Sequence, residues 1–320
     1  MQRHSQHQEQ ATAATSRAGD VFSSSKLPDG RGVTANALSF DVEDYFQVQA
    51  LSDAYPRERW EACEPRVERN TSVLLDLLAA ENSRATFFTL GWVAQRHPSI
   101  IRRIVAEGHE LASHGYAHFR VDGQTPDQFR SDIRKTKQIL EDCAGQAVRG
   151  YRAATFSVGP STGWAFPILE EEGYAYSSSV YPVSTDYHSF PDAPRFAYRP
   201  AGTSDFWEIP ITTLRIGSRN FPFGGGGYFR LMPYALFRSG LRLVRSRHDN
   251  PLMFYLHPWE VDPGQPRPEG VGLKSKFRHY LNLSRTESRL RRLLRDFRWD
   301  RVDVAFAELL PAACASPRAS

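Results

Sequence analysis

The sequence has few cysteines, and none of them is in a paired motif. Cys63, Cys143 and Cys314 are the three cysteines in 320 residues, and no CxxC or CxH spacing occurs around them. This usage excludes a disulfide framework and a cysteine-based zinc site, and it is typical of a reducing compartment. We therefore expect one sizeable hydrophobic core, or two small ones, to stabilise the fold.

Long apolar runs are also absent. No uninterrupted apolar stretch approaches the roughly 20 residues that a membrane-spanning helix needs. The first thirty-odd residues are polar and lack the apolar core of a secretory signal, so we interpret residues 1–33 as a disordered tail. We predict a cytoplasmic protein without a transmembrane segment, peripheral at the inner membrane if its substrate is linked to lipid.

The chain has no block of charge of one sign. Its net charge of +4 comes from arginines scattered through helical stretches such as "SRTESRLRRLLRDF", residues 284–297, which is typical of a solvated helix face. The glycine run Gly224 to Gly227 lacks the GK[ST] ending of a phosphate-binding loop. We therefore expect no nucleic-acid partner and no nucleotide, and we interpret the glycines as a tight turn or a close approach to another segment or a sugar face.

Short apolar runs alternate with longer amphipathic ones, which indicates strands separated by helices. Residues 35–40 and 84–90 predict two strands with a helix over 66–81 between them, and Thr125 predicts the start of a helix that reaches about Gly145. The repeated pattern favours the α/β class and a distorted (β/α) barrel of about seven parallel strands, with a doubly wound sheet as the alternative. In both architectures the ligand site lies at the carboxyl ends of the strands.

Chemically active side chains follow several of these predicted strands. If the strands are parallel, all of these side chains lie at one rim of the barrel. They are Asp41, Glu43, Asp44, His114, His118, Arg152 and His257.

Two histidines and a carboxylate predict a metal site. In a helical turn, His114 and His118 would project to one side, and with one carboxylate they form the open three-ligand set that suits zinc, cobalt or iron. The adjacent acids Asp41, Glu43 and Asp44 would repel one another unless a cation lies among them. Either Glu43 or Asp44 could be the third ligand, and one of the three acids could instead cap a helix.

The remaining polar residues have two interpretations each. His257 could protonate a leaving amine or have a structural role, and Arg152 could hold a carboxylate base or form an ordinary surface ion pair. Five other histidines have no such neighbours, and we expect them on the surface or in packing: His97, His109, His188, His248 and His279.

Four motifs together resemble those of the polysaccharide deacetylases of carbohydrate esterase family four, which have a NodB-type domain. "SFDVED" resembles the TFDD motif of that family, "SHGYAH" its H[ST]xxH motif, "RGYRAATFS" its RxPY segment and "YLHPWE" its LxH motif. They occur in the family's order between about Leu38 and Asp262. "DVEDYFQV", "PFGGGGYFRLMPY" and "HPWEVDPGQP" further resemble deacetylases encoded in bacterial exopolysaccharide loci of the exosortase type, which carry a C-terminal extension.

The resemblance implies a hydrolase that acts on linear amides. The substrate would be the N-acetyl groups of amino sugars in an exopolysaccharide or its lipid-linked precursor, with the synthesis machinery as a partner. The cofactor would be one divalent metal ion, zinc first, with cobalt, nickel or iron as alternatives. The chain would divide into the tail, a NodB-type catalytic domain over 34–262 with a glycine-rich insertion at 217–235, and a mainly helical extension over 263–320.

The resemblance also assigns roles to individual residues. Asp41 would be the general base oriented by Arg152, His257 the general acid, and His114 and His118 metal ligands. Glu43 is the favoured third ligand and Asp44 the alternative, because alternation along a strand places Asp41 and Glu43 on one side. A backbone N–H near Tyr151 or Arg152 would hold the oxyanion, and the residues expected at the substrate are Tyr45, Tyr151 and Trp259.

The sequence departs from the family pattern at two places. Ala154 replaces the proline of RxPY and Thr155 follows it, and Ser177 stands where related chains often have an aspartate that tunes a catalytic group. Two alternatives therefore stay open. The same barrel could hydrolyse a small amide or cyclic imide, or the chain could be a glycan-binding protein whose catalytic site has decayed.

Overall fold

Eight strands form one parallel sheet in the computed structural model, which describes residues 35–310. The order is β10-β1-β2-β3-β4-β5-β6, and β9 also pairs with β1. The predicted tail and Cys314 lie outside the described residues. The strands are β1 (Asn36–Val42), β2 (Thr86–Thr89), β3 (Glu110–Ser113), β4 (Gly150–Tyr151), β5 (Tyr176–Ser177), β6 (Trp207–Glu208), β9 (Met253–Leu256) and β10 (Trp299–Asp300).

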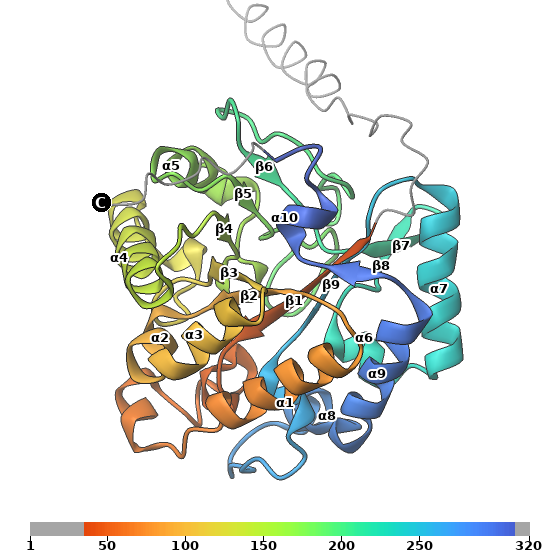
Figure 1. Cartoon of the computed structure of the whole chain (residues 1–320), viewed down its shortest axis with the longest axis horizontal. Coiled ribbons are helices and arrows are strands. Elements are labelled where there is room, and N and C mark those ends of the chain that lie inside the picture. Colours follow the sequence, from red (N-terminus) through yellow and green to blue (C-terminus); the bar gives the residue numbers. More distant parts are fainter. Residues whose placement is uncertain (1–34, 311–320) are drawn as a thin grey trace, which may run out of the picture.

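Helices surround this sheet as an incomplete ring, from α5 and α4 through α2, α3, α1 and α9 to α7 (Figure 1). No helix within residues 35–310 is both long and apolar enough to cross a membrane. The alternation of strands and helices confirms the predicted distorted (β/α) barrel. The helices are α1 (Val67–Ala80), α2 (Gly91–Arg96), α3 (Pro98–Ala106), α4 (Pro126–Ala144), α5 (Ala165–Glu171), α6 (Gly226–Leu231), α7 (Tyr234–Arg247), α8 (Leu273–Tyr280), α9 (Thr286–Asp296) and α10 (Val302–Ala305).

Helix α4 shows how local sequence determines an element. The Thr125 hydroxyl accepts a hydrogen bond from the Gln128 N–H, and the Gln128 side chain accepts one from the Thr125 N–H, which is a capping box. Gly145, with φ of 66°, ends the helix in the left-handed conformation that glycine adopts easily. Both ends agree with the prediction from sequence.

Irregular segments fill the space between β6 and β9. The Thr212 N–H donates to the Met253 carbonyl (3.2 Å), and the Tyr255 N–H donates to the Gly224 carbonyl (2.8 Å). A Cβ atom at Gly224 would lie 2.6 Å from that Met253 oxygen, so this position has no room for a side chain. The interpretation of the glycine run as a close approach to another segment is therefore confirmed. An antiparallel hairpin of β7 (Thr213–Ile216) and β8 (Arg219–Pro222) precedes it.

The C-terminal part of the chain contributes to the main sheet as well as to the helical layer. Strand β10 pairs in parallel with the start of β1, with Asn36 opposite Trp299. The sequence did not predict this strand, because two residues are too short to show an alternating pattern. The division of the chain at residue 262 stays a prediction.

Candidate metal centre and catalytic pocket

A cavity of about 290 Å³ lies at the carboxyl ends of β1, β3 and β9. The side chains that follow these three strands line it, as the predicted parallel sheet requires. Among the lining residues are Asp41, Glu43, His114, His118, His257 and Trp259.

Three buried side chains at the base of this cavity can share a metal ion. The potential ligand atoms of Glu43, His114 and His118 all lie within 4.8 Å of one another. The His118 Nε2 and Glu43 Oε2 atoms are 3.0 Å apart. Two imidazoles and one carboxylate leave coordination positions open for water and substrate.

The protonation of these groups fits a divalent cation. Burial lowers the pKa of His114 and that of His118, so both imidazoles are neutral near pH 7. The His114 Nδ1 lies 2.9 Å from the Arg152 carbonyl, so Nδ1 carries the proton and Nε2 keeps its lone pair for a metal. Glu43 Oε2 is buried and accepts no hydrogen bond within residues 35–310, because the nearby His118 Nε2 is not aligned as a donor to it; a bound cation would complete this environment.

The loop that carries the two histidines is not helical, so the predicted helical turn was wrong. Gly115 has φ of 72° and His118 has φ of 53°. Its carbonyl groups bond outward: Gly115 accepts from the first N–H of α2, and the Arg57 guanidinium donates to the Ala117 and His118 carbonyls at 2.8 Å. These external partners, rather than the HxxxH spacing, bring both imidazoles to the cavity.

The Asp44 carboxylate has a structural role at the start of α1. Its Oδ1 accepts the Tyr45 N–H (2.8 Å), and its Oδ2 accepts the N–H groups of Arg66 (2.6 Å) and Val67 (2.9 Å) at the start of α1. These bonds satisfy backbone donors that a helix terminus leaves free. The geometry therefore favours Glu43 over Asp44 beside the histidines.

Asp41 is held by a buried arginine. The Arg152 Nη1 donates to Asp41 Oδ1 (2.5 Å) and to the Ser39 hydroxyl (2.9 Å), while Nε and Nη2 donate to the Ser178 carbonyl and hydroxyl. The arginine is fully buried, with its guanidinium 4.1 Å from the Phe88 ring centroid. The orientation of the guanidinium group is thus fixed, and this group aligns one carboxylate oxygen of Asp41.

His257 faces both acids across the cavity. Its Nε2 lies 3.9 Å from Asp41 Oδ2 and 3.6 Å from Glu43 Oε1. Burial lowers the pKa of His257, but the nearby carboxylates of Glu260, Glu43 and Asp41 outweigh burial and raise it above its ordinary value. Burial likewise raises the pKa of Glu43, to about 7, although His257 opposes that shift.

Of the aromatic residues expected at the substrate, Trp259 lines the cavity. Its ring stacks on His257 with centroids 5.0 Å apart, and its indole N–H donates to Glu43 Oε1 (3.4 Å). Tyr45 and Tyr151 do not line the cavity: their rings are buried against other aromatic side chains of the core.

The backbone donor expected near the oxyanion is also engaged elsewhere. The Arg152 N–H donates to the Ser113 carbonyl (2.9 Å), because β4 pairs with β3 at this point. This N–H extends the sheet and is not directed at a substrate.

Three residues near the site were not found from the sequence. Thr155 and Phe156 line the cavity with φ of 56° and 53°. A positive φ is strained for a β-branched or bulky residue, and such strain is concentrated at functional sites. The third is Glu260, whose carboxylate contacts His257. The spacing of His257 and Glu260 within "HPWE" was the available signal for this contact.

Ser177 does not contact the catalytic groups. Its hydroxyl shares a hydrogen bond with that of Ser179 (2.6 Å), and both are buried. The carboxylate that the structure places on His257 therefore comes from residue 260 rather than from residue 177.

A barrel with a Glu-His-His group at the carboxyl ends of its strands has the ligand set with which metal-dependent hydrolases hold their ion. Residues 54–167 match the family model described as polysaccharide deacetylase. Residues 178–307 match a second model, described as a domain of unknown function, DUF3473. Residues 54–167 thus form a polysaccharide deacetylase domain, and the site takes His114 and His118 from this segment and His257 from the second.

Curated relatives support this assignment over part of the chain. A peptidoglycan-N-acetylglucosamine deacetylase of Bacillus cereus is 40% identical over 82 residues, which are 26% of this chain and 30% of the relative. A chitooligosaccharide deacetylase of Rhizobium leguminosarum bv. trifolii is 35% identical over 83 residues, 26% of this chain and 39% of the relative. These matches span about a third of the length of the relatives.

A solved structure shares the fold. It is assigned to the polysaccharide deacetylases and comes from Mycobacterium smegmatis, with 22% sequence identity and a TM-score of 0.52. The superposition covers 85% of this chain and 93% of that one. At this level of identity, the likeness establishes the distorted barrel.

Proposed function

We propose that this protein is a metal-dependent deacetylase that hydrolyses N-acetyl groups of amino sugars in a glycan. The observation that carries the proposal is the convergence of three functional units on one cavity. These units are the Glu43-His114-His118 group, the Asp41-Arg152 pair and His257. Such a set provides a metal site, a base and an acid within reach of one amide.

A divalent ion held by Glu43, His114 and His118 would supply Lewis acidity toward an amide carbonyl and would lower the pKa of a water molecule. Asp41 accepts the proton of the attacking water through the carboxylate oxygen that Arg152 leaves free. His257 donates a proton from Nε2 to the departing sugar nitrogen, because an amine is a poor leaving group unless it is protonated. Acetate and a free amino sugar are the products.

The walls of the cavity support a sugar substrate. Trp259, Tyr228 and Tyr255 line it, and aromatic faces stack on sugar rings while tyrosine hydroxyls bond to sugar hydroxyls. The related proteins named above act, by their names, on peptidoglycan and on chitooligosaccharides. These observations support a glycan over a small amide or cyclic imide.

The finer substrate assignment is an exopolysaccharide or its lipid-linked precursor. It is supported by the resemblance of the glycine-rich and "HPWEVDPGQP" segments to deacetylases of exosortase-type loci. A cytoplasmic location, peripheral at the inner membrane beside the synthesis machinery, belongs to the same proposal. Fractionation of cells and co-purification with membrane components would test it.

The test of the proposed function is acetate release by protein loaded with zinc. We expect release from N-acetylated oligosaccharides and much slower release from acetamide or ring opening of a cyclic imide. The His114→Ala variant should release none. Equal activity of metal-free protein, or activity confined to the small amides, would refute the proposal. Glycan binding by the loaded protein without any acetate release would favour a decayed site.

A further inference from the structure

One nitrogen of His257 points away from the cavity, toward a buried carboxylate. The His257 Nδ1 lies 2.9 Å from Glu260 Oε1, and the same oxygen accepts the His257 backbone N–H (3.1 Å). Glu260 is 1% exposed and lies in the short 3₁₀ helix Pro258–Val261 directly after His257. Its carboxylate therefore fixes both the backbone and the ring of the histidine.

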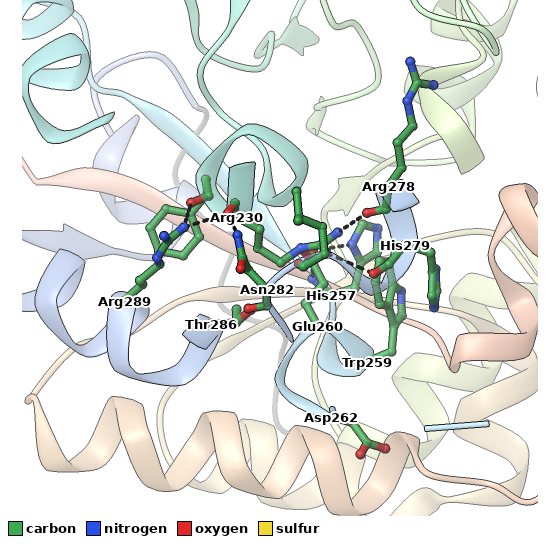
Figure 2. A network of polar contacts seen from close by, with 12 residues as sticks. Arg230, His257, Trp259, Glu260, Asp262, Arg278, His279, Asn282, Thr286 and Arg289 are labelled. Atoms are coloured by element: carbon green, nitrogen blue, oxygen red, sulfur yellow. Dashed lines mark hydrogen bonds and ion pairs between the residues drawn. The ribbon is translucent and has the colours of Figure 1, made fainter. Parts of the chain in front are cut away.

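Glu260 is in turn held by an arginine from α6. The Arg230 Nε donates to Glu260 Oε2 (2.7 Å), and Arg230 is 3% exposed. The remaining N–H groups of Arg230 donate to the carbonyls of Arg278, His279 and Leu281 at 2.6–3.0 Å. Figure 2 shows Arg230 among Glu260, Arg278 and His279. Arg230 is thus anchored to the end of α8 and has a fixed orientation toward Glu260.

The residues around Glu260 and His257 are closely packed. Helix α6 begins at Gly226, and a Cβ atom there would collide with both carboxylate oxygens of Glu260. On the other side, Trp259 lies between the rings of His257 and His279, with its centroid 4.1 Å from that of His279. The carboxylate, the arginine and the stacked rings hold one another in place.

This arrangement determines which nitrogen of His257 exchanges protons. Arg230 opposes the effect of burial on Glu260 and, with His257, keeps the pKa of this carboxyl below its ordinary value, so Glu260 is ionised. An ionised carboxylate can only accept hydrogen bonds, so the His257 Nδ1 must carry a proton. Nε2 is then the exchanging nitrogen, and it is the one that faces Asp41 and Glu43.

We propose that Glu260, clamped by Arg230, is the positioning residue for His257. The pair aims Nε2 at the leaving nitrogen of the substrate, and it gives the segment described as a domain of unknown function a role in the chemistry of the site. This inference rests on the proposed deacetylation. Water supplies the hydroxyl of acetate, and the C–N bond breaks with its electron pair on nitrogen. The nitrogen takes the Nε2 proton, while Nδ1–H stays on Glu260.

Two substrates separate a positioning role from a structural one. An amide needs its leaving nitrogen protonated, whereas 4-nitrophenolate leaves an acetyl ester without help from an acid. In zinc-loaded protein, Glu260→Gln should lower kcat on an N-acetylated oligosaccharide by roughly 10- to 100-fold. It should change KM for that substrate, and hydrolysis of 4-nitrophenyl acetate, by less than about threefold. Equal losses on both substrates would overturn the proposal.

Matched variants complete this experiment. Glu110→Gln makes the same change at a buried glutamate that bonds to Thr86 and Tyr176, outside the cavity, and it should alter neither activity. Glu260→Asp keeps the charge and should restore part of the loss on the oligosaccharide. If Glu260→Asp is no better than Glu260→Gln, the carboxylate is not what acts on His257.

A spectroscopic measurement covers the case in which Glu260→Gln does not fold. In zinc-loaded wild-type protein with ¹⁵N-labelled histidine, the His257 Nδ1 should be the protonated nitrogen, with His257→Gln giving the assignment. A proton on Nε2 alone would refute the positioning role. Wild-type protein that hydrolyses neither substrate would instead refute the proposed function and leave this measurement valid.

Discussion

The three acids near the end of β1 have different partners although they lie within four residues. Asp41 pairs with Arg152, Glu43 faces two histidines, and Asp44 accepts three backbone N–H groups. The backbone of β1 and of the turn after it points the three carboxylates in different directions, so each contacts a different group. Substitution of each acid should therefore have a different effect.

Glu43 and Asp44 can be separated by metal content and stability. Glu43→Gln should weaken zinc binding by more than roughly 100-fold, because even changes outside the ligand set cost about 10- to 100-fold. Asp44→Asn should keep zinc but lower the free energy of unfolding by about 2 kcal/mol, because its amide group faces the N–H donors of Arg66 and Val67. Mass spectrometry of bound metal and urea unfolding measure the two effects. Loss of zinc in Asp44→Asn would reverse our assignment.

Substitutions of Asp41 and His114 should differ in whether the protein keeps its zinc. Asp41→Asn should retain zinc and lower kcat by about 10²- to 10⁴-fold, the usual contribution of a general base. His114→Ala should lose zinc and activity together. Bound zinc and acetate release are measured separately for each variant. An Asp41→Asn variant with wild-type turnover would exclude this residue as the base.

Helix α6 begins with a close approach to Glu260. Its first residue, Gly226, lies against Glu260, whereas a Cβ atom at the next residue, Gly227, would have nothing within 4 Å. Gly226, like Gly224, is therefore needed for a close approach, and Gly227 is not.

Alanine substitutions in α6 test this difference. Gly226→Ala should lower the free energy of unfolding by about 1–3 kcal/mol through overpacking, and it should reduce kcat because Glu260 is displaced. Gly227→Ala should raise the free energy of unfolding by up to about 1 kcal/mol, since alanine is the better helix former. Thermal unfolding and acetate release are the measurements. Similar behaviour of the two variants would contradict the packing described here.

For the whole molecule, buried histidines predict sensitivity to acid. His109 lies just before β3, and its Nδ1 accepts the Ala85 N–H (3.2 Å). Burial lowers the pKa of His109 from 6.5 to about 4, and it lowers the pKa of His279 to about 3. The unfolded chain therefore binds more protons than the folded one below pH 6.5, so stability falls as the pH falls through this range.

The His109→Asn variant isolates one of these contributions. Asparagine can accept the Ala85 N–H without titrating, so the variant should lose about 2 kcal/mol less than wild type between pH 7 and pH 5. Urea unfolding of both proteins at the two pH values measures this difference. Changes at the metal centre are the same in both proteins, so they cancel in the comparison. An identical pH dependence in both proteins would show that His109 does not contribute.

The elements that the sequence predicted are those with short-range signals. The capping box of Thr125, the left-handed Gly145 and the apolar spacing of α4 lie within 21 residues of one another, so local propensity and one buried face determine that helix. The placement of the candidate catalytic groups at one rim followed from the parallel strands, because such strands bring their carboxyl ends together.

The sequence by itself determined the barrel, its rim and the residue types gathered there. The tertiary structure decided which groups each of them contacts. Asp44 caps α1 because the N–H groups of Arg66 and Val67 reach it from 22 and 23 residues away. Arg57 donates hydrogen bonds to the carbonyls of the loop that carries the two histidines. Arg230, 30 residues before Glu260, donates one to the Glu260 carboxylate. Local pattern carries no information on such pairings, because they depend on which distant donors the packed chain brings within hydrogen-bond distance.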